Sequence, residues 1–195
     1  MRIGIFGGTF DPIHVGHLAA AVNAQYGAQL DKVLMVVANI PWQKEGMRKV
    51  YPAEERLALV EAAVQGVSGL EASDLEIKRG GKSYTIDTVT QIRSIYPNDE
   101  LFLIIGADVA ADLDSWEMVE DIAKLVTLII VNRPGSIRPR NLREIWNYLE
   151  VEVPALDISS TDLRARAIDG RPLDYLIPYR AIQYIREHRM YRSEE

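Results

Sequence analysis

Two histidines near the start of the chain follow a pair of glycines, and residues of these types in this order can bind a triphosphate. Residues 7–17 read GGTFDPIHVGH, and the apolar helical pattern LAAAV follows directly. Paired glycines let a backbone come close to phosphates, and a helix start offers N–H groups and the positive end of its dipole. The imidazoles of His14 and His17 can donate hydrogen bonds to phosphate oxygens and stabilise charge as pyrophosphate leaves. Gly16, between them, is interpreted as a gap where a side chain would crowd a nucleotide.

Other chemistries fit this segment less well. Two histidines three residues apart can be a coincidence on a helix surface, and this pair lacks the intervening glutamate of a zinc metalloprotease. Gly4, Gly7 and Gly8 do not have the spacing of a dinucleotide-binding fingerprint. The Gly-Lys-Ser/Thr ending of a phosphate-binding loop is absent as well.

A second polar segment, near the C-terminus, has the form of a helix entrance. Residues 158–164 read ISSTDLR, in which Ser159 and Asp162 fit a capping box. An exposed helix N-terminus with three hydroxyls and an arginine one turn in can cradle a phosphate. The alternative is a well-capped surface helix on which Arg164 is solvated.

Strand-like and helical patterns alternate along the chain. Short apolar runs predict strands at Arg2–Phe6, Lys32–Ala38, Leu70–Ile77, Glu100–Gly106, Val126–Asn132 and Val151–Pro154. Helical periodicity predicts helices at Gly16–Gln29, Ala53–Gly66, Ser83–Ile95, Trp116–Ala123, Leu142–Tyr148, Ser160–Asp169 and Pro178–Arg189. This alternation is typical of an α/β fold, a Rossmann-like, doubly wound and mostly parallel sheet with helices on both faces. Ligands of such folds bind beyond the carboxyl ends of the strands, where the polar segments of this chain fall.

Length and composition limit the class of protein. The 195 residues, 48% hydrophobic and 26% charged, match one globular domain, with a helical C-terminal part from about residue 155. Without cysteine, a thiol nucleophile, a disulfide and a cysteine zinc site are excluded. The net charge of -6 disfavours nucleic acid as a partner. Since no apolar stretch has the length of a membrane span or a signal-peptide core, we expect a cytoplasmic protein with no membrane partner.

The two polar segments together carry a family resemblance. The residues HVGH match the HxGH signature of the nucleotidyltransferase superfamily, and the longer run GGTFDPIHVGH resembles the bacterial nicotinate-nucleotide adenylyltransferase family. The residues ISSTDLR are similar to the ISSTxxR element of the same family. First-class aminoacyl-tRNA synthetases share the histidine motif, but they are much longer and have a KMSKS loop that this chain lacks. Phosphopantetheine adenylyltransferases and glycerol-phosphate cytidylyltransferases diverge at the second segment.

This resemblance implies a single nucleotidyltransferase domain over residues 1–195 and a set of ATP-binding residues. His14 and His17 take the catalytic role, and Gly106 and Asp108 contact the riboses and adenine at the end of a central strand. An aspartate that only closes the strand is the alternative for Asp108. The expected ATP-binding residues are Gly7, Gly8, Thr9, Phe10, Gly106, Asp108, Ser159, Ser160, Thr161 and Arg164.

In this family the second substrate carries a pyridine ring and a carboxylate. The ring needs a flat apolar partner, and the carboxylate needs N–H groups or a cation. In the family, the tryptophan of a GADxxxxLxxW-like stretch stacks on the pyridine, and a YTIDT-like stretch contacts the carboxylate. This chain has Trp116 and Thr85 at those positions, each expected at a helix start. An amphipathic-helix core residue is the alternative for Trp116.

Three further residues are expected near the second substrate by the same resemblance: Asn39, Lys44 and Arg133. A solvated surface position is the alternative for Lys44 and Arg133. Many relatives have a Pro-His-Lys loop where residues 41–44 of this chain read PWQK, so the lysine is kept and the histidine is missing. We expect Trp42 to shield the site instead.

The implied reaction is adenylyl transfer from ATP to nicotinate mononucleotide by direct in-line attack, giving deamido-NAD (nicotinate adenine dinucleotide) and pyrophosphate in NAD biosynthesis. Mg²⁺ is the expected cofactor, held mainly by ATP oxygens and water, because the sequence shows no dedicated carboxylate cage and predicts no protein metal site. Nicotinamide mononucleotide or another phosphate acceptor stays open as the second substrate. So does a non-catalytic nucleotide sensor. Tyrosines around the last helix leave a homodimer open.

Overall fold

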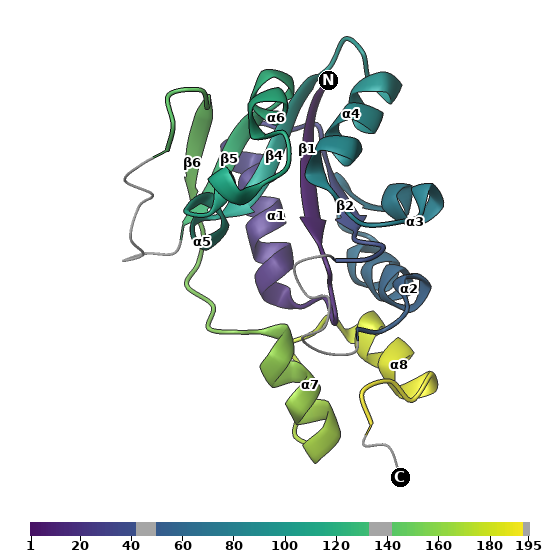
Figure 1. Cartoon of the computed structure of the whole chain (residues 1–195). Coiled ribbons are helices and arrows are strands. Elements are labelled where there is room, and N and C mark those ends of the chain that lie inside the picture. Colours follow the sequence, from purple (N-terminus) through teal and green to yellow (C-terminus); the bar gives the residue numbers. More distant parts are fainter. Residues whose placement is uncertain (42–49, 133–141, 193–195) are drawn as a thin grey trace.

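A computed structural model describes residues 1–41, 50–132 and 142–192, and a six-stranded sheet lies at its centre (Figure 1). The strands are β1 (Arg2–Gly8), β2 (Lys32–Val37), β3 (Leu70–Ser73), β4 (Glu100–Gly106), β5 (Thr127–Asn132) and β6 (Tyr148–Glu152). Their order is β3-β2-β1-β4-β5-β6, and every neighbouring pair is parallel. The predicted α/β class is therefore confirmed, with a sheet that is parallel in all its pairs.

Helices cover both faces of this sheet. They are α1 (Val15–Gly27), α2 (Ala53–Val64), α3 (Leu75–Arg79), α4 (Thr85–Ile95), α5 (Ala107–Ala110), α6 (Val119–Leu125), α7 (Ser160–Asp169) and α8 (Tyr179–Glu187), with a 3₁₀ turn, η2 (Leu113–Ser115). One apolar core contains side chains of α1, α2, α7 and α8. The other contains side chains of α3 to α6.

The central strands are apolar on both faces, because each face is covered by helices. In β4, Phe102 and Ile104 belong to the first core, while Leu101, Leu103 and Ile105 belong to the second. Successive side chains of a strand point to opposite faces, so this alternation follows from the pleat of β4. The unbroken apolar run of the sequence thus becomes a strand buried on both sides.

One predicted strand extends too far, and one predicted helix is wrong in type. The expected strand Leu70–Ile77 ends at Ser73, and α3 follows, in which the Lys78 N–H donates to the Asp74 carbonyl at 2.8 Å. The expected helix Leu142–Tyr148 is absent, since residues 142–147 form no helix. There the Asn147 carbonyl accepts from Leu128 N–H at 2.9 Å, so pairing with β5 overrides the local helical pattern.

A third prediction is wrong at its start. The helix expected over Trp116–Ala123 begins only at Val119, and Trp116 instead ends the turn η2. Met118 separates the two with a left-handed backbone (φ 51°), which a continuous right-handed helix cannot contain. Trp116 is therefore on a connection between helices, not just inside a helix as expected.

The sheet extends in opposite directions from its two central strands, β1 and β4. From β1 it proceeds to β2 and β3, and from β4 to β5 and β6, so the crevice between β1 and β4 is the topological switch point. Helices α7 and α8 lie beyond the carboxyl ends of the strands, below the sheet in Figure 1. In the described part of the chain, no helix is long and apolar enough to span a membrane.

Gly4→Ala tests the packing between β1 and the first core. A Cβ at Gly4 would lie 2.7 Å from Leu30 Cδ1 and 3.0 Å from Ile104 Cδ1. Overpacking of this kind costs about 1–3 kcal/mol of stability. Alanine also lowers the conformational entropy of the unfolded chain, which stabilises the protein by only about 0.4–1 kcal/mol. We expect urea unfolding to show a net loss of about 1 kcal/mol in the free energy of unfolding. An unchanged or higher value would contradict the described packing.

Candidate active site

A pocket of about 220 Å³ lies at the switch point, where β1 and β4 end side by side. Its floor consists of residues 5–8 of β1 and 103–106 of β4, and segments after β2 and before α4 complete it. Six residues predicted from the sequence line this pocket: Gly7, Gly8, Thr9, Thr85, Gly106 and Trp116. The pocket thus lies at the carboxyl edge of the sheet, where the parallel topology predicts a ligand site.

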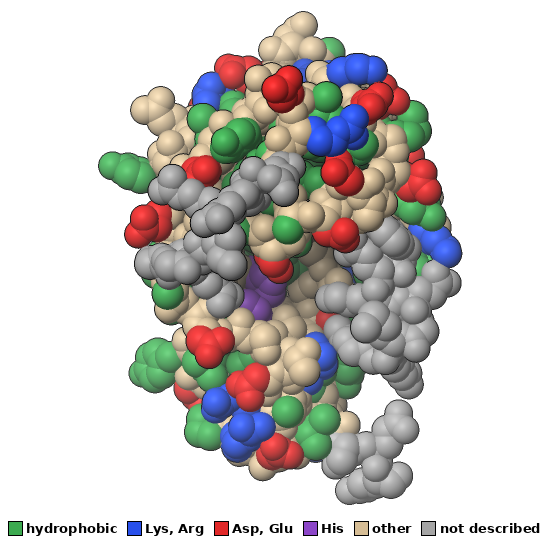
Figure 2. All heavy atoms as spheres, turned by 60° about the vertical axis from the view of Figure 1, so that its left-hand side comes forward, with side chains coloured by type: hydrophobic (Ala, Val, Ile, Leu, Met, Phe, Trp, Pro, Cys, Tyr) green, Lys and Arg blue, Asp and Glu red, His purple; other side chains and the backbone are tan. Residues whose placement is uncertain are grey.

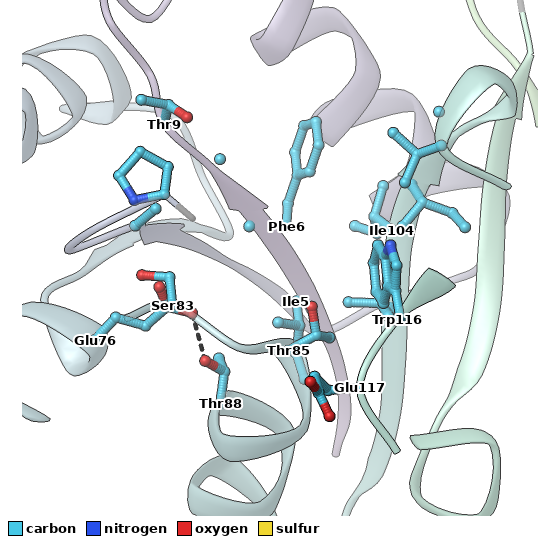
Figure 3. A pocket seen from close by; sticks show the side chains of 18 residues that line it. Ile5, Phe6, Thr9, Glu76, Ser83, Thr85, Thr88, Ile104, Trp116 and Glu117 are labelled. Atoms are coloured by element: carbon cyan, nitrogen blue, oxygen red, sulfur yellow. Dashed lines mark hydrogen bonds between the residues drawn. The ribbon is translucent and has the colours of Figure 1, made fainter. Parts of the chain in front are cut away.

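The two sides of the pocket differ in character (Figure 3). Glu76, Ser83 and Thr88 lie together on one side, and Trp116 lies beside Ile104 on the other. Glu76 was missed in the sequence, because α3 was expected to be part of a strand, whereas Ser83 and Thr88 fall in the predicted helix Ser83–Ile95 without having been assigned as site residues. Glu76 directly follows the apolar Leu75, and a single glutamate in that position is only a weak signal for a pocket-lining residue. The pocket therefore offers a flat apolar wall opposite a polar one.

The polar side is a network that joins α3 to α4. The Thr88 hydroxyl donates to Glu76 (Figure 3), and Arg79 donates to the Thr88 oxygen at 3.1 Å and to Gln91 at 3.1 Å. Glu76 and Thr88 are both buried. The guanidinium of Arg79 lies 3.9 Å from the Glu76 carboxylate and offsets part of its charge. This network fixes the position of the first turns of α4 beside the pocket.

Gly7 and Gly106, at the ends of β1 and β4, have different surroundings. A Cβ at Gly7 would meet nothing within 4 Å, so this glycine faces open space in the pocket. A Cβ at Gly106 would lie 2.4 Å from Oδ1 of Asp108, so the glycine lets that carboxylate fold back against the end of β4. Asp108 itself is exposed in the first turn of α5 and does not line the pocket.

The two histidines occupy the start of α1, directly after the loop that follows β1. His14 is the N-cap, and its backbone N–H donates to Nδ1 of His17 at 3.2 Å. With Nδ1 as an acceptor, a neutral His17 carries its proton on Nε2, which makes that nitrogen the donor. The rings stack with centroids 3.7 Å apart. Histidine side chains lie in a hollow of the face shown in Figure 2.

The neighbours of these rings come from the same segment. Phe10 is buried, has a left-handed backbone (φ 49°) and meets the His17 ring edge-on at 5.1 Å. A Cβ at Gly16 would lie 3.0 Å from the His14 ring. The close neighbour of Gly16 is therefore His14, which qualifies the idea that this glycine makes room for a nucleotide. Phe10, His14 and His17 lie beside the pocket and are not among its lining residues.

The second predicted segment docks onto the first. Ser160 Oγ donates to the Pro12 carbonyl at 2.9 Å, and Arg164 donates to the Asp11 carbonyl at 2.7 Å and to Thr161 Oγ1 at 3.0 Å. The N-terminus of α7 thus meets the histidine-bearing segment, although the bonded pairs are 148 and 153 residues apart in sequence. The structure therefore brings the two polar segments together.

Half of the predicted capping box is present. The Asp162 N–H donates to Ser159 Oγ at 3.1 Å, so Ser159 caps α7 as expected. The Asp162 carboxylate accepts from Arg166 at 2.6 Å, an ion pair along the helix. The cap itself stabilises a helix by about 1 kcal/mol. It also leaves Ser159, Thr161 and the start of α7 at the surface, where a phosphate can reach them.

A buried arginine, missed in the sequence, ties the loops of the site together. Arg56 of α2 is 1% exposed, and its guanidinium donates to the carbonyls of Tyr51 (2.8 Å), Thr9 (2.8 Å) and Asn39 (3.0 Å). The signal for it was a charged residue on the apolar face of a predicted helix, one turn before Leu59 and Val60. A buried guanidinium needs such partners, because its desolvation is costly.

Asn39, predicted as a substrate contact, acts as a link between two loops. Its side-chain amide donates to the Gly81 carbonyl at 2.9 Å, and its backbone N–H donates to Ser83 Oγ at 2.8 Å. The segment after β2 is thereby joined to the segment before α4. Tyr84, the N-cap of α4, makes no side-chain cap hydrogen bond, and Thr85, the first residue of the helix, lines the pocket.

Three of the expected residues fall outside the described part of the chain: Lys44, Arg133 and Trp42. Their expected positions therefore stay predictions. Within residues 1–41, 50–132 and 142–192, no three His, Asp or Glu side chains are grouped so as to hold a metal ion.

Comparison with known proteins gives the same picture. The model of the cytidylyltransferase-like family matches residues 5–166. A Corynebacterium kroppenstedtii protein named "Probable nicotinate-nucleotide adenylyltransferase" is 43% identical over 97% of this chain and 90% of its own. A Bacillus pumilus protein of the same name is 37% identical over 98% and 99%. Nicotinic acid mononucleotide adenylyltransferase of Plasmodium falciparum, solved with NaAD, is 20% identical over 97% of both chains with a TM-score of 0.80.

The switch-point pocket and the matching family model make this chain a nucleotidyltransferase of the cytidylyltransferase-like family. The sequence identity to these relatives extends over almost the whole length of both chains and indicates one branch of this family. The chain belongs to the nicotinate-nucleotide adenylyltransferases, the enzymes that join nicotinate mononucleotide and ATP into deamido-NAD.

Gly7→Ala tests the role of the open space at the end of β1. The new Cβ meets no protein atom within 4 Å, so we expect the free energy of unfolding to stay within about 0.5 kcal/mol of the wild-type value. The methyl group does occupy pocket volume, so kcat/KM for ATP should fall about tenfold or more. Gly4→Ala, in the same strand, is the matched control: it should lower the free energy of unfolding and leave kcat/KM for ATP of the folded enzyme unchanged. Unchanged ATP kinetics in Gly7→Ala would contradict the placement of ATP beside Gly7.

Proposed function

We propose that the site catalyses direct in-line attack of the nicotinate mononucleotide phosphate on the α-phosphorus of ATP. The observation that carries this proposal is the docking of α7 onto Asp11 and Pro12, in the segment that carries His14 and His17 beside the switch-point pocket. The substrate phosphate is ionised at neutral pH, so no enzyme nucleophile is required. The protein then has two tasks, to position both substrates and to stabilise charge at the reacting phosphorus.

At the ATP end, donors from two elements converge. We assign Nε2 of His17 as a donor to the triphosphate, because Nδ1 accepts from the His14 backbone. The start of α1 adds the positive end of its dipole. Ser159, Thr161 and Arg164 approach the same segment from α7 and supply hydroxyl and guanidinium donors. Gly7 and Thr9 line the part of the pocket that leads to the histidines, where we place the reacting phosphates.

At the acceptor end, the two walls of the pocket match the two parts of nicotinate. Trp116 offers a flat apolar surface to the pyridine ring. Thr85 begins α4, whose N-terminus is a favourable place for a carboxylate. Two carboxylates, Glu76 and the exposed Glu117, also line the pocket, and a bound anion must lie away from both. We therefore assign the nicotinate carboxylate to the backbone N–H groups at the start of α4.

Mg²⁺ would enter this site bound to ATP. When bound to ATP, it would supply charge neutralisation to the leaving pyrophosphate. Asp108, exposed in the first turn of α5 just after β4, would be available to orient its waters. Its exposure allows that role without direct ligation.

The acceptor is tested by pyrophosphate release from ATP with nicotinate mononucleotide, nicotinamide mononucleotide and phosphopantetheine in parallel. The helix N-terminus at Thr85 favours a carboxylate over a neutral amide, so kcat/KM should be at least about tenfold higher for nicotinate mononucleotide. An equal or reversed preference would contradict the acceptor assignment. No pyrophosphate with any of the three would favour a nucleotide sensor.

His17→Ala tests the charge-stabilising role at the ATP end. Loss of one donor to the developing charge should lower kcat about 10²–10³-fold, while circular dichroism shows an unchanged fold. His188, exposed at the end of α8, provides the control, since His188→Ala removes an imidazole far from both motifs in sequence. A folded His17→Ala enzyme with wild-type kcat would remove His17 from the mechanism.

A further inference from the structure

The last described turn of the chain lies against the segment that carries the histidines. Tyr191 is 3% exposed, and its hydroxyl donates to Oδ1 of Asp11 at 2.8 Å. Its backbone N–H donates to the Tyr51 hydroxyl at 2.5 Å, and the two rings lie 4.4 Å apart. These contacts join residues 180 and 140 positions apart in the sequence. The C-terminal segment is thus fixed to the site from two directions.

The backbone of Tyr191 supports the view that these contacts are specific. Its φ of 55° is left-handed, a conformation that costs a residue with a side chain about 1–3 kcal/mol. Such a cost persists only where surrounding contacts hold the residue in place. The hydrogen bonds to Asp11 and Tyr51 are contacts of this kind.

Asp11 is the residue through which Tyr191 reaches the site. It is 1% exposed, and a carboxylate so far from water needs hydrogen-bond donors. Its carbonyl accepts from Arg164, and the next carbonyl, of Pro12, accepts from Ser160. Residues 11 and 12 are therefore held by α7 through the backbone and by Tyr191 through the side chain. His14 lies three residues after Asp11, so the position of Asp11 affects where α1 begins.

The phenol is suited to a permanent donor role. Burial raises the pKa of Tyr191 above its ordinary value, and the adjacent Asp11 carboxylate raises it further. The hydroxyl therefore keeps its proton throughout the physiological pH range. The ring packs in the first core, so ring and hydroxyl make separate contributions that a Phe substitution separates.

We propose that Tyr191 is a positioning residue for adenylyl transfer: its hydroxyl holds Asp11 and thereby sets the orientation of His14 and His17 toward the triphosphate. This inference rests on the proposed role of the histidines. Tyr191 touches neither substrate in this arrangement. It acts only through Asp11.

The test compares Tyr191→Phe with Tyr184→Phe. Both remove a hydroxyl that donates to a carboxylate, since Tyr184 donates to Glu55 at 3.0 Å, away from the histidine segment. We expect Tyr191→Phe to lower kcat about tenfold or more with little change in the KM for nicotinate mononucleotide, because small displacements of catalytic groups act on the transition state. Tyr184→Phe should keep the wild-type kcat.

A readout independent of activity is the NMR signals of the imidazole nitrogens, which come from three histidines in all. Tyr191→Phe should shift the signals of His14 and His17 and leave those of His188 unchanged. Tyr184→Phe should do the reverse, since His188 stacks on Tyr184 with centroids 3.8 Å apart. A third variant, Asp11→Ala, removes the acceptor and should abolish any further effect of Tyr191→Phe on kcat, because Tyr191 acts through that side chain.

The outcomes separate this inference from the proposed function. If wild-type enzyme transfers adenylyl groups while Tyr191→Phe leaves both kcat and the His14 and His17 signals unchanged, the positioning role is overturned and the function stands. If Tyr191→Phe moves those signals while wild-type enzyme shows no transfer, the positioning role stands and the function fails. Additive effects of Asp11→Ala and Tyr191→Phe on kcat would also overturn the inference.

Discussion

The buried guanidinium of Arg56 is the constraint on which the geometry of the site depends. A parallel sheet brings the carboxyl ends of β1 and β2 to one edge, but the loops that follow can diverge in many directions. Arg56 donates to Thr9 after β1, Asn39 after β2 and Tyr51 before α2. An arginine cannot lose its proton, so its charge tolerates burial only while such acceptors stay in place. The loops are thereby held at fixed distances from one another.

From this cation, hydrogen bonds extend to both halves of the pocket. On one side, Asn39 joins Gly81 and Ser83, which precede α4 and the proposed carboxylate site. On the other, Thr9 leads into the histidine segment, to which α7 and the C-terminal turn are bonded. A reaction between two bound substrates depends on their relative position, which a rigid frame of this kind supplies. The chemistry proposed for the site needs little more than this frame and a few aligned donors.

The sequence predicted the parts of this arrangement that are local. The strands and the Gly7–His17 segment follow from apolar runs and from glycines and histidines in one short stretch. Where a local pattern competed with sheet pairing, as at residues 142–147, the prediction failed because the partner strand lies elsewhere in the chain. Arg56 and Tyr191 were missed for a related reason, since their partners are carbonyls or side chains up to 180 residues away. Trp116 was placed at the pocket through the neighbouring motif, although its local structure was predicted wrongly.

The central claim is that one edge of the sheet holds the pyridine near Thr85 and Trp116 and the reacting phosphates near His17. A crystal structure with deamido-NAD bound tests this most directly. The account predicts the nicotinate ring against Trp116, its carboxylate at the backbone N–H groups of Thr85, and the pyrophosphate bridge within hydrogen-bonding distance of His17. A dinucleotide bound in the reverse direction, with adenine against Trp116, would contradict it.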